Sequence, residues 1–257
     1  MVSAAPKRPI PPDPTHYPVE DDVGEGIVHK LVAELLRPLV ERWLDSLGTP
    51  TFVGSNQFIY WVQYAPTRRV DPDVYVLPGV APGADIEIWK VWETGIVPSF
   101  ALEVVARDPT EAYELAPRRY AELGVRELVV FDPKFESAAD RCRWQVFRRV
   151  ARRGFVLVER TNADRVRSKV LDAWLRVVGE GAAARVRVAS GARGEVLFPT
   201  EAEAAHAAEE AAHAAAEAAR AAAKAERAAK DAESARRVQA ETEVASLRAQ
   251  LEALRRR

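Results

Sequence analysis

Two acidic residues lie in stretches whose composition is otherwise that of buried strands. Asp73 belongs to the run PDVYV, and Glu103 belongs to the run SFALEVV. An ionised carboxylate inside a protein is costly unless a cation or a good hydrogen-bond partner compensates it. Two such groups brought together also repel each other, and a shared proton or a divalent metal ion relieves that repulsion. The two acids therefore predict a metal site.

The same acids also have structural interpretations, which the residues alone leave open. Asp73 follows a proline and can simply cap a turn or the start of a strand. Glu103 lies in an apolar run and needs a partner, which a salt bridge to Arg118 or Arg119 would supply. The sequence shows no Gly-rich phosphate loop, zinc-ligand pattern or Ser/His/Asp arrangement that would indicate a different chemistry.

The region that must position the two acids alternates between helices and short strands. Apolar residues recur every three and four positions from Ile27 to Leu47, which predicts an amphipathic helix that Gly48 ends. Short apolar runs predict strands at residues 58–64, 74–77, 86–91 and 101–105. The acids are therefore expected on, or next to, neighbouring strands.

A second helix and strand follow and define the fold class. A helix is predicted from Thr110 to Leu123, and Gly124 ends it directly before a buried strand at residues 128–131. This order predicts a right-handed crossover between parallel strands. Residues 144–150 and 155–160 predict a hairpin, and short strands and loops continue to Leu197. The sequence thus predicts an α/β domain.

Composition divides the chain into three regions. Residues 1–22 are rich in proline and poor in apolar residues, which predicts a disordered arm. Residues 23–198 contain all six tryptophans and are expected to form the folded domain. Residues 199–257 are dominated by Ala, Glu and Arg, which predicts a long α-helix.

The predicted tail helix carries an apolar seam near its end. Its members alternate at spacings of four and three: Ala240, Val244, Leu247, Leu251 and Leu254. This short heptad pattern predicts a coiled coil. We therefore expect a homo-oligomer that forms through the C-terminal helix.

Charge, cysteine content and hydropathy bear on the partners of the protein and on its location in the cell. The 37 Lys and Arg residues nearly balance the 38 Asp and Glu residues, so net charge does not indicate a nucleic-acid partner. The single Cys142 excludes an intramolecular disulfide and fits a reducing compartment. No stretch approaches about 18 uninterrupted apolar residues, and the start lacks the apolar region of a signal peptide. We expect a cytoplasmic protein that does not span a membrane.

Residues 58–133 resemble a known family in three successive segments. These segments are FIYWVQYAPTRRVDPDVYVLPGV, IEIWKVWETGIVPSFALEVVARD and YELAPRRYAELGVRELVVFDP. They are similar to the bacterial family of putative restriction endonucleases called Uma-two, within the PD-(D/E)XK nuclease superfamily. The resemblance implies a restriction-endonuclease-like mixed sheet flanked by helices. It also implies hydrolysis of DNA phosphodiester bonds with Mg²⁺ or Mn²⁺.

The resemblance assigns roles to particular residues. Pro72-Asp73 matches the PD of the family, and Glu103 matches the acid of its following strand, so both carboxylates would bind metal. The backbone carbonyl of Val105 would be a further metal ligand. Mg²⁺ prefers oxygen ligands and keeps several waters, which suits two carboxylates from adjacent strands.

The chain departs from the family pattern where a lysine is expected. One common lysine position is Val105, and the other, four residues before Tyr120, is Ala116. The acid that the family often carries on this helix is replaced by Ala112. The expected substitutes for the lysine are Arg118 and Arg119, with Lys90 and Lys134 as alternatives. Arginine can offset charge but is a poor proton donor or acceptor.

Three hypotheses about function follow. The first is a Mg²⁺-dependent DNA endonuclease in which Asp73 and Glu103 bind metal and Arg118 or Arg119 replaces the lysine. The second is a non-catalytic descendant of the nuclease fold that binds DNA or a protein through its helical tail. The third is a structural or adaptor protein that acts through the tail alone.

Overall fold

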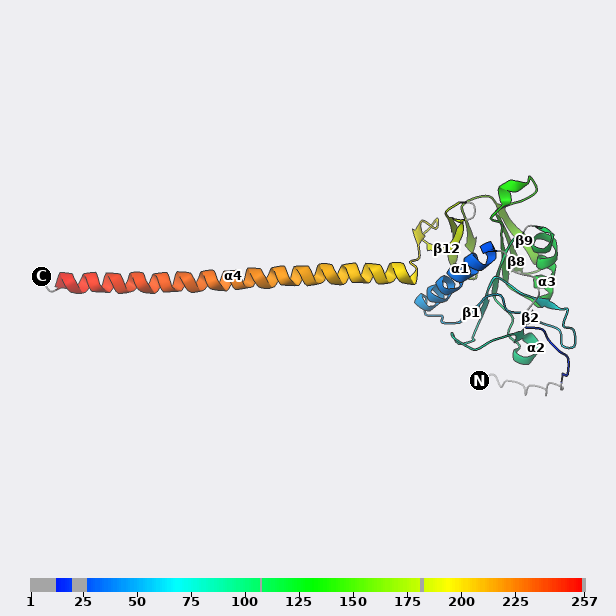
Figure 1. The fold of residues 1–257 in the computed structure, drawn as a ribbon, viewed down its shortest axis with the longest axis horizontal. Coiled ribbons are helices and arrows are strands. Elements are labelled where there is room, and N and C mark those ends of the chain that lie inside the picture. Colours follow the sequence, from blue (N-terminus) through cyan, green and yellow to red (C-terminus); the bar gives the residue numbers. More distant parts are fainter. Residues whose placement is uncertain (1–12, 20–26, 107, 181–182, 256–257) are drawn as a thin grey trace. The chain divides into compact units, whose positions relative to one another are not determined.

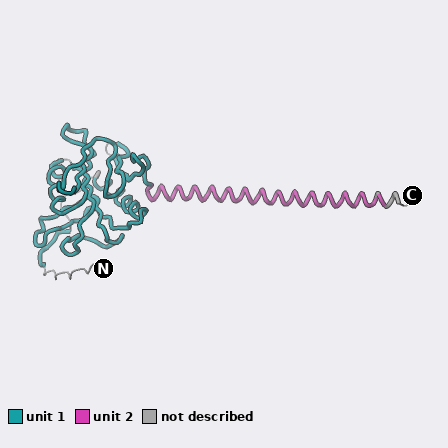
Figure 2. The backbone as a smooth tube through the Cα atoms, turned by 180° about the vertical axis from the view of Figure 1, so that it is seen from behind, with its two compact units in different colours: residues 1–198 teal, residues 199–257 magenta. Residues whose placement is uncertain are grey.

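The computed structural model describes residues 13–19, 27–106, 108–180 and 183–255. The chain divides into two compact units, residues 1–198 and residues 199–257 (Figure 2). Of the predicted arm, residues 1–12 and 20–22 lie outside the described residues. Residues 13–19 pack on the first unit through Tyr17, whose ring lies 4.9 Å from that of Tyr60 and whose hydroxyl accepts the Tyr64 N–H.

A central six-stranded sheet organises the first unit (Figure 1). Its strand order is β1-β4-β6-β7-β8-β9, and only β6 and β7 run parallel. The strands are β1 (Phe52–Gly54), β4 (Val74–Leu77), β6 (Phe100–Val104), β7 (Glu127–Phe131), β8 (Trp144–Val150) and β9 (Gly154–Thr161). The predicted parallel crossover between β6 and β7 is confirmed, and so is the predicted hairpin.

Successive residues of the central strands pack into two separate cores, because side chains alternate between the faces of a sheet. One face, with Val74, Leu102 and Val129, packs against α1 (Ile27–Ser46) and a second sheet. The opposite face, with Tyr75 and Ala101, packs against α3 (Ala116–Leu123) and a third sheet. The central sheet is therefore covered on both faces, which gives the mixed α/β architecture that the sequence predicts.

The second and third sheets are formed by short strands. The second sheet has the order β10-β11-β12-β13 and the third has the order β3-β2-β5. Their strands are β10 (Arg165–Ser168), β11 (Ala173–Val178), β12 (Arg185–Ser190), β13 (Val196–Leu197), β2 (Ile59–Tyr60), β3 (Arg69–Val70) and β5 (Trp89–Lys90).

Two predicted strands are much shorter than their apolar runs suggest. The run at 58–64 forms only β2, because Tyr64 adopts a left-handed conformation with φ 63° and the chain turns there. The run at 86–91 forms only β5, because Val91 begins the short helix α2 (Val91–Thr94) that left-handed Gly95 ends. Glycine adopts positive φ without steric cost, so it ends a helix readily.

The helix predicted from Thr110 to Leu123 is divided. Residues Glu111–Leu115 form a π-helical turn, η1, and α3 follows it. Such wide turns often lie at functional sites, because one extra residue redirects the neighbouring side chains. Gly124 ends α3 in a left-handed conformation, as predicted. A single 3-10 turn, η2 (Phe135–Ser137), lies between β7 and β8.

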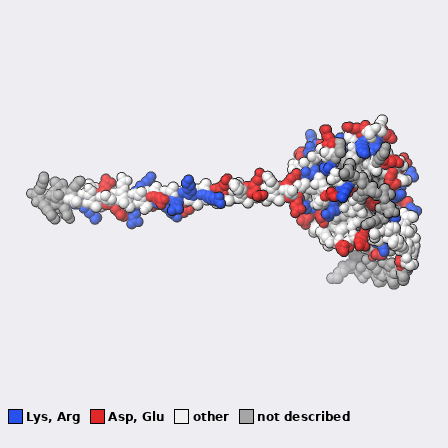
Figure 3. Space-filling model, viewed as in Figure 1, with Lys and Arg blue, Asp and Glu red and all other residues white. Residues whose placement is uncertain are grey.

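The second unit is one helix, α4 (Glu201–Arg255), as predicted. It starts with a reciprocal cap: the Glu203 N–H donates to the Thr200 hydroxyl, and the Glu203 carboxylate accepts the Thr200 N–H. Acidic and basic side chains are distributed along it (Figure 3). In the part of the chain that is described, no helix combines the length and apolar character needed to cross a membrane.

Candidate active site

Strand pairing brings the two predicted acids to the same edge of the central sheet. In the antiparallel pair of β4 and β6, Val74 lies opposite Leu102. Continuing this register by one residue places Asp73 opposite Glu103. Asp73 lies directly before β4, and its negative charge acts on the Glu103 carboxyl group. The two carboxylates are therefore neighbours, even though thirty residues separate them in the chain.

The Asp73 carboxylate is buried and held from two sides. Only 4% of the residue is exposed. Its Oδ2 accepts the backbone N–H of Val104 at 2.7 Å. Its Oδ1 lies 3.2 Å from Nδ1 of His29, on helix α1. Both oxygens of this buried carboxyl group therefore have a nitrogen neighbour.

Glu103 lies under helix α3, whereas Asp73 contacts α1, the helix that covers the opposite face of the sheet. The hydroxyl of Tyr120 donates to its Oε1. Burial raises the pKa of Glu103 well above its ordinary value of 4.5, and the negative charge of Asp73 raises it further, while the Tyr120 hydrogen bond opposes the rise. Burial and the nearby charge of Glu103 raise the pKa of Tyr120 as well. Tyr120 therefore remains a hydrogen-bond donor at neutral pH.

A cavity of about 70 Å³ opens beside Glu103. Exposed acids lie around its rim: Asp71, Asp108 and Glu111. Since one water needs roughly 10–15 Å³ of such volume, the cavity has room for several waters. Asp73 is not one of the described residues that line the cavity.

The structure distinguishes between the basic residues that the sequence left open. Arg119 lines the cavity and pairs with Glu111, whereas Arg118 is not among its described lining residues. Lys90 pairs with Glu93 and lies over the ring of Tyr17, away from this wall. Among the proposed substitutes for the lysine, Arg119 is the one that faces the same space as Glu103.

Three residues at family-typical functional positions are buried and apolar. Val105 is 2% exposed, and its N–H donates to the Phe131 carbonyl at 2.8 Å. Ala112 and Ala116 are 6% and 5% exposed and form part of the cavity wall. Methyl groups therefore stand where the resemblance implies an acid and a lysine.

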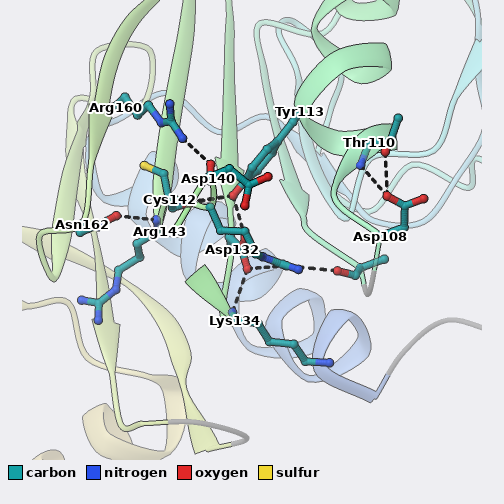
Figure 4. A network of polar contacts seen from close by, with 12 residues as sticks. Asp108, Thr110, Tyr113, Asp132, Lys134, Asp140, Cys142, Arg143, Arg160 and Asn162 are labelled. Carbon is teal, nitrogen blue, oxygen red and sulfur yellow. Dashed lines mark hydrogen bonds and ion pairs between the residues drawn. The ribbon is translucent and has the colours of Figure 1, made fainter. Parts of the chain in front are cut away.

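A buried polar network supports the rim of this cavity (Figure 4). Asp132, directly after β7, is fully buried, and Arg141 donates to both of its oxygens at 2.7 and 2.9 Å. The Tyr113 hydroxyl, on η1, donates to Asp132 at 2.7 Å. Arg141 also reaches the carbonyl of Ala106 on the cavity wall at 3.4 Å. The network thus ties η1 and the chain after β6 to the end of β7.

The donor set fits Mg²⁺ or Mn²⁺ better than zinc. Across the described ranges, no group of three or more His, Cys, Asp or Glu side chains is arranged to hold a metal ion. Structural zinc sites require about four such ligands. Mg²⁺ is commonly bound by one or two carboxylates and retains several waters. Asp73 and Glu103 are two carboxyl groups beside a cavity, which is a donor set of that type.

The raised pKa of Glu103 predicts a pH dependence of stability in metal-free buffer. Below pH 4.5 the carboxyl is protonated in both the folded and the unfolded chain, so it has no effect. Above pH 4.5 the unfolded chain releases this proton while the folded chain keeps it, and stability falls by up to about 1.4 kcal/mol per pH unit. The loss ends once the folded-state pKa is passed.

We expect the neutral variant Glu103→Gln to escape this loss, because the amide stays uncharged and still accepts the Tyr120 hydroxyl. Urea denaturation of both proteins in EDTA from pH 4 to pH 8 measures the difference. The variant should gain stability relative to the parent as pH rises. A difference that stays constant across this range would contradict the raised pKa.

Sequence reasoning missed several residues that the structure places at the site. The role of His29 was not apparent from the sequence, because its partner Asp73 is distant along the chain. Asp71 stands two residues before Asp73 and lines the cavity, and a D-x-D spacing at a strand start was a usable signal. Asp132 ends the buried run ELVVFD, so the same reasoning that identified Glu103 applied to it.

Comparisons with known proteins identify the family of the chain. No curated protein matches the chain. A solved structure that resembles it is the "Crystal structure of a putative nuclease belonging to DUF820 from Anabaena variabilis ATCC 29413", with 11% identity and a TM-score of 0.39. That likeness covers 58% of this chain and 75% of the other. The family model Uma2, described as "Putative restriction endonuclease", matches residues 19–177. Since this match spans more than half of the sequence, the chain belongs to the Uma2 family.

Proposed function

We propose that this protein is an endonuclease that hydrolyses phosphodiester bonds of DNA with Mg²⁺ or Mn²⁺. The observation that carries the proposal is the convergence of Asp73 and Glu103 at one sheet edge, beside a cavity with room for several waters. A divalent ion bound there would supply a water of lowered pKa and a positive charge for phosphate oxygens. Family membership supports the nuclease class.

The side chains around the cavity have distinct roles in this proposal. Asp73 and Glu103 hold the cation, and their hydrogen bonds to Val104 and Tyr120 fix their orientation. Arg119 offers positive charge to the phosphate from the cavity wall. Arginine stays protonated, so it stabilises charge but does not move a proton. The attacking water is therefore expected to lose its proton to bulk solvent or to a rim carboxylate such as Asp71.

Contact with DNA is expected to be local. On the face shown in Figure 3, basic and acidic side chains are interspersed over the first unit. The net charge of −1 provides no general attraction to a polyanion. The number of phosphates that the protein neutralises should then be small, and its affinity for DNA should depend only weakly on salt concentration.

The proposed site of action is the cytoplasm, a reducing compartment that suits a protein with a single cysteine.

The tail helix is proposed to pair two protomers. Val244, Leu247 and Leu251 are 48%, 53% and 55% exposed and repeat at heptad spacing on one side of α4. A stripe of this kind is buried when a second helix packs along it. Ion pairs within the helix, such as Lys230 with Glu226 at 2.7 Å, support the helix itself rather than the pairing.

A second candidate function is a non-catalytic module that binds DNA or a protein. The observation in its favour is the pair of buried methyl groups, Ala112 and Ala116, in the wall where the family carries an acid and a lysine. A site without that lysine retains the fold and the metal-binding acids but loses one means of orienting the attacking water.

A cleavage assay distinguishes the two candidates. Supercoiled plasmid and single-stranded DNA are incubated with the full chain in Mg²⁺, in Mn²⁺ and in EDTA. The endonuclease proposal predicts nicked or shortened products with either metal and none in EDTA. Absence of product with both metals, together with retarded migration of the same DNA, would favour the binding module instead.

A further inference from the structure

Helix α1 brings a histidine to the buried carboxylate of Asp73. Nδ1 of His29 lies 3.2 Å from Oδ1, and the side chains of His29 and Asp73 are 20% and 6% exposed. The other oxygen, Oδ2, accepts the Val104 N–H at 2.7 Å. The two oxygens of one carboxyl group therefore contact nitrogen atoms of different elements, one on α1 and one on β6.

The imidazole is carried by the first turn of α1, directly before residues that pack in the core. His29 begins the stripe of α1 that faces the core, and the residues three, four and seven positions later are Val32, Ala33 and Leu36. These three are 0%, 2% and 0% exposed and belong to the larger core cluster. A side chain on such an element is positioned more accurately than one on a loop.

We infer that His29 is a positioning residue for Asp73 in the metal site. A carboxylate held by one donor can rotate about its Cβ–Cγ bond, whereas a second donor on the other oxygen fixes its plane. Each carboxylate oxygen has two lone pairs, so both oxygens keep one for a cation. The inference rests on the proposed function, because it concerns the geometry of the same metal site.

The role does not depend on the charge of the histidine. Nδ1–H can donate from the neutral ring that carries its proton at Nδ1, and also from the imidazolium ion. Outer residues that orient metal-binding side chains typically change metal affinity by about 10–100-fold when they are replaced. Replacement of His29 should therefore weaken the binding of metal alone, before any DNA is present.

Three substitutions separate positioning from direct metal binding. The amide nitrogen of His29→Asn occupies the place of Nδ1, the amide nitrogen of His29→Gln occupies the place of Nε2, and His29→Ala provides neither. His206→Ala, on the exposed tail, is the matched histidine control. Titration of each protein with Mn²⁺ by calorimetry gives the dissociation constant, and urea unfolding in EDTA shows whether each variant folds.

The inference predicts that His29→Ala weakens Mn²⁺ binding by about 10–100-fold, that His29→Asn restores most of this loss, and that His206→Ala binds as the parent does. Unchanged binding by folded His29→Ala would overturn it. Rescue by His29→Gln but not by His29→Asn would also overturn it, because Nε2 would then act directly on the ion. If the parent chain itself binds no Mn²⁺ and cleaves no DNA, the proposed function fails as a whole.

A spectroscopic measurement keeps the inference testable if the His29 variants do not fold. In metal-free protein labelled with ¹⁵N-histidine, Nδ1 of His29 should carry a proton whose resonance moves when Asp73 is replaced by Asn. The resonance of His206 should not move. An unprotonated Nδ1 at His29, or a resonance that is insensitive to Asp73→Asn, would show that the donor is absent.

Discussion

Replacement of Glu103 by Ala should abolish metal-dependent cleavage of DNA. Glu103 is one of two carboxylates that meet at the sheet edge, and only Glu103 also lines the cavity. A metal ion provides several kcal/mol of charge stabilisation in the transition state, which corresponds to roughly 10²–10⁴-fold in rate. The loss should appear in kcat, measured on plasmid DNA with Mg²⁺ and with Mn²⁺.

The control for this substitution is Glu114→Ala, because Glu114 is an exposed glutamate on the nearby turn η1. Its replacement should leave the rate within about twofold, as expected for an exposed residue that is not among the described residues lining the cavity. Cleavage that survives Glu103→Ala would come from a contaminating nuclease or from another site. Equal losses in the two variants would also remove the special role assigned to Glu103.

Deletion of the tail after Pro199 should leave the first unit folded and lower the oligomeric state of the protein. The second compact unit begins at residue 199 of the chain, and the core residues of the first unit all precede it. In a single helix the seam residues Val244, Leu247 and Leu251 are about half exposed, and pairing would bury them. Light scattering coupled to gel filtration should show the full chain as a dimer and the shortened chain as a monomer.

A variant of the full chain separates pairing from other effects of the deletion. Leu247→Glu combined with Leu251→Glu keeps a helix-favouring residue at each position but places charge in the seam. This variant should also be a monomer, and Glu209→Gln with Glu210→Gln on the exposed early part of α4 should not be. An unchanged number of chains after tail deletion would contradict pairing through α4.

Much of the central sheet could be predicted, because its signals are local. The buried runs at β4, β6 and β7 lie within a residue of their predicted positions, and Gly124 marks the end of α3. The order strand, helix, strand then fixes the parallel pairing of β6 and β7. The small third sheet was not predictable in the same way, since its two-residue strands depend on turns at Tyr64 and Gly95.

In the candidate site too, residues marked by their sequence neighbours were predictable, whereas contacts between distant parts of the chain were not. Glu103 and Asp73 were identifiable because each is an acid in an apolar run. The choice of Arg119 over Arg118 follows from helical phase, since α3 buries Ala116 and Tyr120 and turns Arg119 to the cavity. The contact between His29 and Asp73 was not predictable, because it depends on how α1 packs across the sheet.

A crystal of the full chain soaked in Mn²⁺ tests the central claim most directly. Anomalous scattering locates the ion without reference to activity. The prediction is a peak at the edge of the central sheet, with oxygens of both Asp73 and Glu103 about 2.1 Å from it. Absence of that peak in crystals whose solvent contains Mn²⁺, or an ion bound only at other residues, would contradict the assignment of this sheet edge as a metal-dependent active site.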